Sequence, residues 1–244
     1  MHFLSKEPKN STSVTGFKST FCLRSTKNVG VLDAAAAFAH GRCIKTTFTR
    51  DNACVAIQSG QAMSRVHVLY AHSAPHASRV NRRMIAAARS LPNVTVSELY
   101  ELYPDFVIDV RREQALLSEA ELIVMQHPIQ WYGMPSLQKE WLDQVLEHGW
   151  AYGKSGNMLE GKGFLLALTT GGGTGAYSAE GEHGYPLEAF LPPYRQTAIL
   201  CRMRWLAPLV LHGARHADEA AVDAHVETYR RLLEGSLASH PTSL

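Results

Sequence analysis

Residues 169–184 read TTGGGTGAYSAEGEHG, and they directly follow the apolar run FLLAL at residues 164–168. A short apolar run of this kind is typical of a buried strand. The glycine-rich stretch should therefore lie at the carboxyl end of that strand. Ligands of an open α/β sheet bind at this edge. The pattern thus predicts both the fold class and the position of its site.

Glycines at positions 171, 172, 173 and 175 allow the backbone to approach a flat ligand, with successive N–H groups turned into one concavity. Tyr177 and His183 follow in the same stretch, and each can donate a hydrogen bond or a proton above such a ring. The residues alone leave a second interpretation open, in which this is a flexible surface loop with an incidental Tyr and His.

The stretch is similar, spacing included, to a loop of the flavin-dependent NAD(P)H:quinone oxidoreductases of the flavodoxin-like superfamily. The resemblance implies that the backbone of four residues contacts the isoalloxazine ring of the flavin: Thr169, Thr170, Gly171 and Gly172. It also makes Tyr177 and His183 the catalytic candidates, lying over the ring where the hydride is transferred.

The composition fits a soluble globular protein, with 244 residues of which 45% are hydrophobic. Residues 1–62 carry eight Lys and Arg against three Asp and Glu, so the basic excess belongs to this leader. We therefore expect no nucleic-acid partner for the folded part. The four cysteines lack CxxC or zinc spacing, which fits a reducing compartment. No apolar run approaches the roughly 18 to 20 residues that span a bilayer.

The leader, residues 1–62, is rich in Ser and Thr, poor in acids and without clear strand or helix periodicity. We expect it to lie outside the fold and to be disordered. It resembles either an organellar transit peptide or upstream sequence included by a misplaced start, with Met63 as the initiator. The second explanation is favoured because the family resemblance begins at Arg65. A short helix over residues 33–38 is a further possibility.

The body begins with a predicted strand over residues 66–71, a polar loop and a helix whose pattern opens at Asn81. Free N–H groups at a helix N-terminus favour a phosphate. The segment resembles the AHP…S…N signature of the same family, with Ser73 in place of the proline. The resemblance implies flavin-phosphate contacts from His72, Ser78 and Asn81, and from the backbone N–H groups of Arg79 and Val80. On the residues alone, Ser78 is equally well a helix cap.

Residues 94–99 are the predicted second strand, and the connection YELYPDFVIDVR follows at residues 100–111. Its LYPDF portion resembles one branch of the family, the ancillary subunits of glutathione-regulated potassium-efflux systems. Two interpretations remain open for this connection. Its aromatic residues either pack on the sheet or form a contact with a second copy or a partner.

Residues 121–126 are the predicted third strand, between helices over 113–120 and 135–147, and HPIQWYGMP follows the strand. Its prolines and glycine predict a tight loop with two exposed aromatic rings. The matching loop of the family runs under the flavin. The resemblance implies contacts, mostly through the backbone, from Ile129, Gln130, Trp131 and Tyr132.

The fourth strand is predicted over residues 163–170 and the fifth over 208–213. A helical pattern over 187–202 is interrupted by Pro192 and Pro193, and a closing helix is predicted over 217–237. The result is an α/β, flavodoxin-like, doubly wound, five-stranded parallel sheet of order 2-1-3-4-5 over residues 63–244. His212 and His216 flank a strand end, and no HExxH occurs, so we expect no metal site.

The resemblance implies an NAD(P)H dehydrogenase (quinone), in which NAD(P)H gives a hydride to flavin N5 and a quinone then accepts two electrons. The resemblance to the efflux-subunit branch implies that the cofactor is FMN, while FAD remains an open alternative. The alternative is a regulatory subunit of a potassium-efflux transporter that uses flavin as a structural or redox-sensing ligand; a simple electron carrier is a weaker third. A homodimer is expected, in the cytoplasm or on the cytoplasmic face of the inner membrane.

Overall fold

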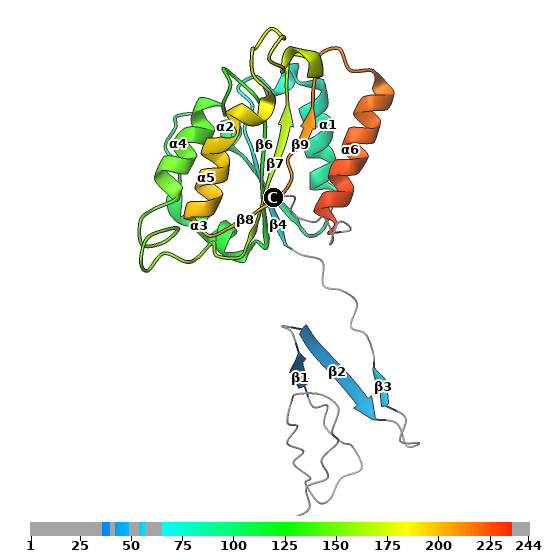
Figure 1. Cartoon of the computed structure of the whole chain (residues 1–244). Helices are drawn as coiled ribbons and strands as arrows, with labels where there is room; N and C mark the ends of the chain where they lie inside the picture. Colours follow the sequence, from blue (N-terminus) through cyan, green and yellow to red (C-terminus); the bar gives the residue numbers. More distant parts are fainter. Residues whose placement is uncertain (1–35, 40–41, 49–53, 57–64, 236–244) are drawn as a thin grey trace, which may run out of the picture. The chain divides into compact units, whose positions relative to one another are not determined.

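The computed structural model describes residues 36–39, 42–48, 54–56 and 65–235 (Figure 1). The chain divides into two units, Met1–Ala62 and Met63–Leu244. Within the described part of the second unit, no helix is both long and apolar enough to cross a membrane.

The N-terminal unit contains three short strands, β1 (Ala36–Ala39), β2 (Arg42–Phe48) and β3 (Cys54–Ala56). β2 pairs antiparallel with both of the others. These strands lie in the leader, where the sequence shows no clear strand periodicity, and β1 occupies part of the segment considered for a helix. β-Branched residues in β2, among them Ile44, Thr46 and Thr47, favour extended backbone. The other leader residues lie outside the described part of the chain.

The second unit is built on a parallel sheet in the order β5-β4-β6-β7, with β8 and β9 sharing the position beyond β7. The strands are β4 (Val66–Tyr70), β5 (Val94–Glu98), β6 (Leu122–Pro128), β7 (Gly163–Thr169), β8 (Arg204–Trp205) and β9 (Leu209–Leu211). The flavodoxin-like order predicted from the sequence is confirmed. β6 and β7 are almost wholly buried, as strands covered on both faces should be.

The fifth strand position is split in two. β8 pairs with the start of β7 and β9 with its end. Three residues, 206–208, stand opposite only two of β7, and Pro208 has no N–H to donate to the sheet. The single strand predicted over residues 208–213 is therefore shorter in the structure, as β9. The strand β8, which shares its position in the sheet, was not predicted.

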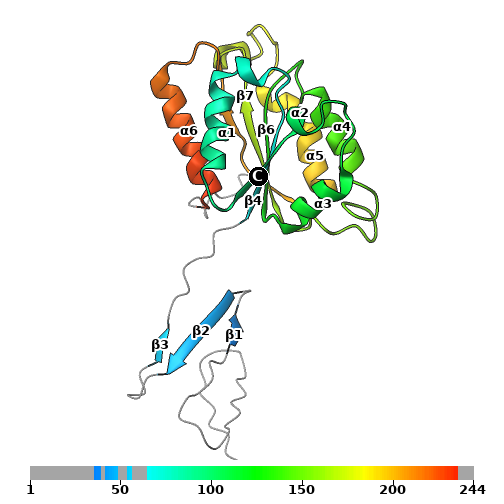
Figure 2. The same cartoon turned by 180° about the vertical axis from the view of Figure 1, so that it is seen from behind.

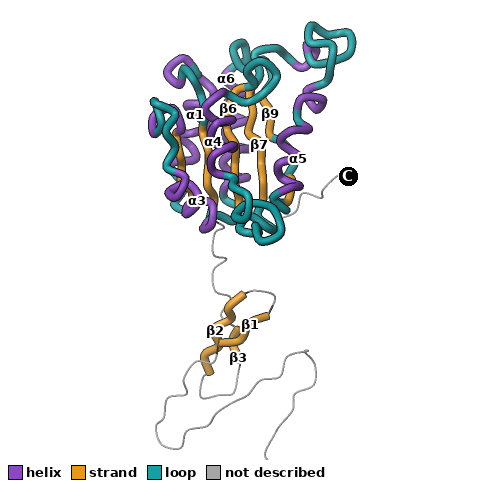
Figure 3. The backbone as a smooth tube through the Cα atoms, turned by 90° about the vertical axis from the view of Figure 1, so that its left-hand side faces the viewer, coloured by secondary structure: helices purple, strands orange, loops and turns teal. Residues whose placement is uncertain are grey.

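Helices cover both faces of the sheet (Figure 1). α1 (Arg79–Arg89) and α6 (Glu219–Leu233) lie on one face, against Val68 and Tyr70 of β4. The other face is covered by α2 (Leu99–Leu102), α3 (Val110–Glu119), α4 (Ser136–Val145) and α5 (Pro192–Leu200). Figure 2 shows the same layers from behind and Figure 3 from the side.

The prolines that interrupt the predicted pattern over 187–202 mark a helix start. A short 3₁₀ turn, η3 (Leu187–Phe190), comes first, and Pro192 and Pro193 then occupy the first positions of α5. Proline is tolerated there because the first turn of a helix has no acceptor for its N–H groups. The closing helix α6 ends at Leu233, before the predicted position 237.

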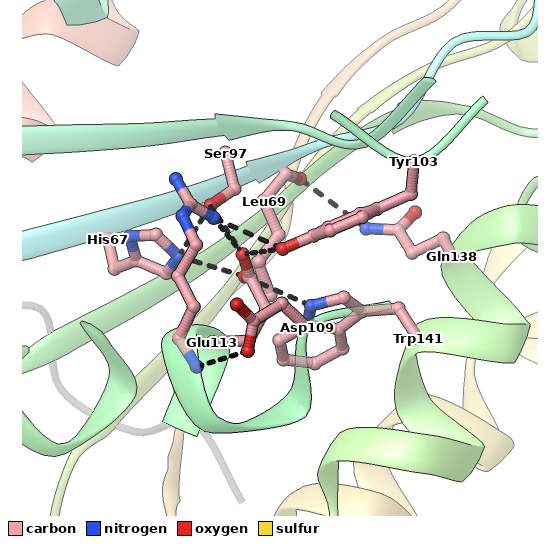
Figure 4. Close-up of polar contacts among 9 residues, drawn as sticks. His67, Leu69, Ser97, Tyr103, Asp109, Glu113, Gln138 and Trp141 are labelled. Atoms are coloured by element: carbon pink, nitrogen blue, oxygen red, sulfur yellow. Dashed lines mark hydrogen bonds and ion pairs between the residues drawn. The ribbon is translucent and has the colours of Figure 1, made fainter. Parts of the chain in front are cut away.

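A buried carboxylate anchors the connection after β5 (Figure 4). Glu113 of α3 is fully buried. Its Oε1 accepts hydrogen bonds from Tyr103 Oη at 2.7 Å and from Ser97 Oγ at 3.2 Å. Its Oε2 accepts one from Trp141 Nε1 at 3.1 Å. Arg112 forms an ion pair with it. Such partners offset the cost of burying a charge. They fix Tyr103 of the LYPDF segment against α3 and α4.

The same connection has an outward side. Leu102, Phe106 and Val107 are exposed, whereas Tyr103 and Ile108 are buried. Tyr103 thus packs inward, as the first interpretation expects, while a contact with a second copy or a partner stays a prediction.

Candidate functional site

Three loops meet at the carboxyl ends of β4, β6 and β7. Gln130 Nε2 donates to Ser73 Oγ at 3.0 Å, which joins the loop after β6 to the loop after β4. The backbone N–H of Ile129 donates to Thr169 O at 2.8 Å, which joins it to the loop after β7. The sequence-predicted site residues come from these loops and are brought together at one edge of the sheet.

The first loop runs from β4 into α1. Ser78 is the N-cap of α1, and its Oγ accepts the N–H of Asn81 at 3.2 Å. The N–H groups of Arg79 and Val80 lie in the first turn, where a helix supplies no acceptor. The Arg79 side chain is directed instead to Glu219 and Ala217 beside α6. This loop therefore offers an anion backbone donors at a helix N-terminus.

His72, in the same loop, is half-buried, and its Nδ1 accepts the N–H of Ala74 at 3.0 Å. Burial lowers the pKa of His72 below its ordinary value, so the ring is neutral near pH 7. A neutral ring that accepts at Nδ1 carries its proton on Nε2, which leaves one donor for a ligand.

A chain of buried hydrogen bonds connects the first and third loops. Asn81 Nδ2 donates to Thr169 Oγ1 at 2.9 Å, and Gln126 Nε2 donates to the Asn81 carbonyl oxygen at 3.2 Å. The hydroxyl of Tyr229, on α6, donates to Gln126 Oε1 at 3.0 Å. All four residues are buried. Asn81 therefore uses its side chain to hold the two loops together.

The second loop contains a tight turn with unusual backbone angles. The backbones of Gln130 and Gly133 exchange two hydrogen bonds of 3.0 Å, and Trp131 and Tyr132 between them have φ of +46° and +66°. Positive φ is costly for bulky side chains, and residues strained in this way cluster at functional sites. The turn leaves the Trp131 side chain 95% exposed.

The third loop holds the two catalytic candidates side by side. The rings of Tyr177 and His183 have centroids 4.3 Å apart. A Cβ on Gly172 would come within 3.0 Å of His183 Nε2 and 3.1 Å of Ala176 Cβ, so any other residue would require these neighbours to shift. Burial raises the pKa of Tyr177, while a hydrogen bond with Thr170 works against the rise. The Tyr177 hydroxyl is therefore protonated at neutral pH and can donate.

Further aromatic rings surround the pair. The ring of Tyr132, from the second loop, lies edge-on to that of His183 with centroids 5.6 Å apart. It stacks on the ring of Phe190 with centroids 4.9 Å apart. The His212 ring lies 5.4 Å from that of Tyr177, and His212 Nδ1 is 3.2 Å from Thr170 Oγ1. Burial lowers the pKa of His212 below its ordinary value, although Glu188 opposes this shift.

The residues present fit a flavin. A Cβ on Gly171 would meet nothing within 4 Å, so the backbone at this point borders open space that a flat ring can occupy. The first turn of α1 supplies donors for a phosphate, and the exposed ring of Trp131 supplies an apolar surface. Within residues 65–235, no group of three or more His, Cys, Asp or Glu side chains could hold a metal ion.

Sequence reasoning missed several residues of this region. Gln126 was predicted only as the last residue of a strand. A polar residue at the end of an apolar run could have indicated that it belongs to the site. His212 was considered only for a metal, and its contacts are instead with Thr170 and Tyr177. Tyr229 and Phe190 gave no local signal, because their roles depend on helices and turns distant in sequence.

A family model described as a flavodoxin-like fold matches residues 64–233. The chain belongs to this flavodoxin-like family. The fold and the three loops at the carboxyl edge of its sheet agree with that membership.

Two similar solved structures are about one third identical to the chain. General stress protein 14 from Treponema denticola, in complex with FMN, is 34% identical, with a TM-score of 0.65 over 70% of this chain and 98% of that one. A thermophilic tryptophan halogenase from "Streptomycin violaceusniger" is 35% identical, with a TM-score of 0.66 over 72% of this chain and 99% of that one.

A third structure carries the name of a redox enzyme. The NADPH-quinone reductase from P. pentosaceus is 25% identical, with a TM-score of 0.64 over 69% of this chain and 97% of that one. The names of these three proteins differ, and the feature they share with this chain is the flavodoxin-like fold.

Proposed function

We propose that the chain is an NAD(P)H:quinone oxidoreductase that works with bound FMN. The observation that carries the proposal is the Tyr177–His183 pair, with ring centroids 4.3 Å apart beside the open backbone of Gly171. The FMN complex of one relative and the NADPH-quinone reductase name of another support it. The bound flavin would take a hydride from NAD(P)H and pass two electrons to a quinone.

The chain's own residues have three tasks in this proposal. The first turn of α1 binds the flavin phosphate through the N–H groups of Arg79 and Val80. Backbone N–H groups at Gly171 and Gly172 stabilise charge that develops on the ring. Tyr177 and His183 donate hydrogen bonds to the quinone and supply the proton that completes the quinol.

The first experiment asks whether the full chain binds flavin and turns over. The purified protein is examined by visible absorption, its ligand is released by heat and identified by mass, and NADPH and then a benzoquinone are added. We expect FMN that is bleached by NADPH and recovers with quinone. A flavin that stays oxidised with NADPH would reject the enzyme, and release of FAD would correct the cofactor.

Two variants test the assigned roles. Tyr177→Phe and His183→Gln should each slow quinone reduction at least tenfold, because general acid catalysis contributes about 10² to 10⁴ in rate. Both should keep FMN bound, since neither residue supplies the phosphate contacts. Tyr185→Phe, in the same loop but outside the pair, is the matched control. Unchanged turnover in both variants would remove Tyr177 and His183 from the mechanism.

A second role is favoured by the connection after β5. Its LYPDF segment resembles ancillary subunits of potassium-efflux systems, and Leu102, Phe106 and Val107 are exposed there. In this role the chain docks on a membrane transporter. Changing the three residues to serine should abolish co-purification with the transporter while quinone reduction continues. Co-purification that survives the change would reject this surface.

A further inference from the structure

His212, the first residue after β9, lies against the third loop of the candidate site. Its Nδ1 is 3.2 Å from Thr170 Oγ1, and its ring centroid is 5.4 Å from that of Tyr177. The reaction proposed for the site assigns no task to this side chain. His212 is therefore a titratable group in contact with a catalytic candidate and without a role of its own.

Backbone hydrogen bonds hold the loop after β9 in this place. Gly213 N–H donates to Gly172 O at 2.8 Å. Ala214 N–H donates to Thr170 O at 2.9 Å. Gly213 has φ of +63°, a conformation that suits glycine. Because the residues that follow His212 are bonded to the third loop, the backbone keeps His212 next to Thr170.

The hydroxyl of Thr170 identifies the donor in its contact with His212. Thr170 is buried, and its Oγ1 donates to Gly172 O at 2.7 Å. A hydroxyl has one proton to donate, so Oγ1 accepts from His212 Nδ1. Burial lowers the pKa of His212 below its ordinary value, although Glu188 opposes the shift, so the ring is neutral at pH 7. The neutral ring therefore carries its proton on Nδ1.

The same hydroxyl also serves Tyr177. Burial raises the pKa of Tyr177, and a hydrogen bond with Thr170 acts against the rise. A hydrogen bond that lowers the pKa of a phenol favours its ionised form, so Thr170 can donate to the phenolate of Tyr177. Thr170 thus stands between a ring that carries a proton and a hydroxyl that is to lose one.

His212 is also in contact with solvent. Its side chain is half-buried, so part of the ring remains accessible to water. The exposed Glu188, in η3, is close enough for its carboxylate to favour the protonated ring. Protons can therefore reach His212 from outside, whereas Thr170 is closed to water.

We propose that His212 is a positioning residue that returns a proton to Tyr177 through the Thr170 hydroxyl. This role rests on the proposed quinone reduction, in which Tyr177 gives its proton to a quinone oxygen. The phenolate then takes the Thr170 hydroxyl proton, and Thr170 takes the Nδ1 proton of His212. His212 takes a proton from solvent and exchanges with water back to the Nδ1 tautomer. One proton enters from solvent for each proton that leaves with the quinol.

The two half-reactions of the FMN-loaded full chain, followed by stopped flow, test this role. Asparagine can keep the hydrogen bond to Thr170 through its amide nitrogen but cannot transfer a proton. His212→Asn should therefore slow oxidation of the reduced protein by benzoquinone about tenfold, part of the roughly 10² to 10⁴ that general acid catalysis contributes. Reduction by NADPH, which needs no proton from Tyr177, should fall far less. His216→Asn, an exposed histidine of the same loop, is the matched control.

Thr170→Val removes the hydroxyl through which the proton passes. It should slow the oxidation step as His212→Asn does, and the double variant should be no slower than the slower single variant, because both changes interrupt one path. Thermal unfolding checks that each variant is folded. Rate losses that multiply in the double variant would overturn the shared path.

His212→Ala distinguishes a proton carrier from a side chain that only fills space. Imidazole in solution should restore the oxidation rate in proportion to its concentration. Pyrazole, a ring of the same shape and a much weaker base, should not. Rescue by both rings equally, or by neither, would overturn the role of His212.

The position of the proton is tested without turnover. Nuclear magnetic resonance of the flavin-free full chain with isotope-labelled histidine reports the tautomer of each ring, and the His212 signal is the one missing from His212→Asn. We expect the proton on Nδ1 at pH 7. A neutral ring with its proton on Nε2 would overturn the path.

Turnover separates this role from the proposed function. A wild-type protein that binds no FMN or reduces no quinone would overturn the proposed function, and the role of His212 with it. Quinone reduction at the same rate in the wild type and in His212→Asn would overturn the role of His212 alone.

Discussion

Gly171 and Gly172 are neighbours in the chain but have different surroundings. A Cβ at Gly171 would meet open space, whereas a Cβ at Gly172 would press on His183 and Ala176. Gly171→Ala should therefore leave the unfolding temperature of the flavin-free protein unchanged but weaken FMN binding. Gly172→Ala should displace His183 and slow turnover. Visible-absorption titration and thermal unfolding measure these effects.

Gly175→Ala is the control for both, since its Cβ would also meet open space but lies beyond the Thr-Thr-Gly-Gly segment. FMN affinity that is equal in Gly171→Ala and in the wild type would show that the flavin does not lie against this backbone.

The motif of residues 169–184 grouped Thr169, Thr170, Tyr177 and His183, and the structure places the rings of the last two with centroids 4.3 Å apart. The roles of these residues stay predictions. Tyr229 could not be predicted, because its partner Gln126 is 103 residues away and the contact exists only once α6 packs on the sheet. The positive φ of Trp131 could not be predicted either, because tryptophan has no preference for this backbone conformation.

The buried hydrogen-bond chain makes α6 part of the candidate site. Tyr229→Phe leaves Gln126 Oε1 without its donor, and Gln126→Leu leaves the Tyr229 hydroxyl buried without an acceptor. Each change should lower the free energy of unfolding by about 1–3 kcal/mol. The double variant leaves neither group unpaired, so its loss should be smaller than the sum.

Urea unfolding of the four proteins measures this coupling. Thr228→Ala, on the same helix but bonded only to the α6 carbonyl of Ala224, serves as the control. FMN affinity should fall in Gln126→Leu, because this residue also holds Asn81. Strictly additive losses would mean that Gln126 and Tyr229 act independently.

The Glu113 cluster predicts a pH dependence. Burial alone would raise the pKa of Glu113, but contacts with His67, Tyr103 and Trp141 outweigh it, so the pKa lies below its ordinary value. A depressed carboxyl pKa stabilises the folded state above the unfolded-state value of about 4.3. That stability is lost as the pH falls through the lower folded-state pKa.

Glu113→Gln isolates this contribution from that of other carboxylates. The wild type should be more stable than the variant at pH 7, and the difference in unfolding free energy should shrink as the pH falls below about 4.3. Urea titrations at a series of pH values measure it. A difference that is constant from pH 7 to pH 3 would show that the charge of Glu113 does not stabilise the fold.

The interior strands could be predicted from the sequence, whereas the sheet edge could not. β6 and β7 are continuous apolar runs, and burial on both faces leaves them little choice of structure. The edge strand has a neighbour on one side only, so fewer contacts determine its structure. Residues 206–208, which stand opposite only two residues of β7, divide it into β8 and β9. The prolines at the start of α5 were misread as an interruption for a similar reason, because a start and a break give the same local pattern.

The chain as a whole divides at residue 62, and the two units differ in how far the sequence accounts for them. The sequence predicted the five-position parallel sheet of residues 63–244 together with its site loops. It did not predict the antiparallel strands β1, β2 and β3, because these short segments show no clear alternation of apolar and polar residues.

Residues 63–244 should fold and function alone. The chain divides into compact units at residue 62, and the family model matches residues 64–233, within the second unit. If the second unit is an independent domain, removing residues 1–62 should change its unfolding temperature by no more than about 2 °C. Flavin content and quinone reduction should equal those of the full chain, measured side by side. A large fall in the unfolding temperature, or loss of flavin, would show that residues 63–244 are not an independent unit.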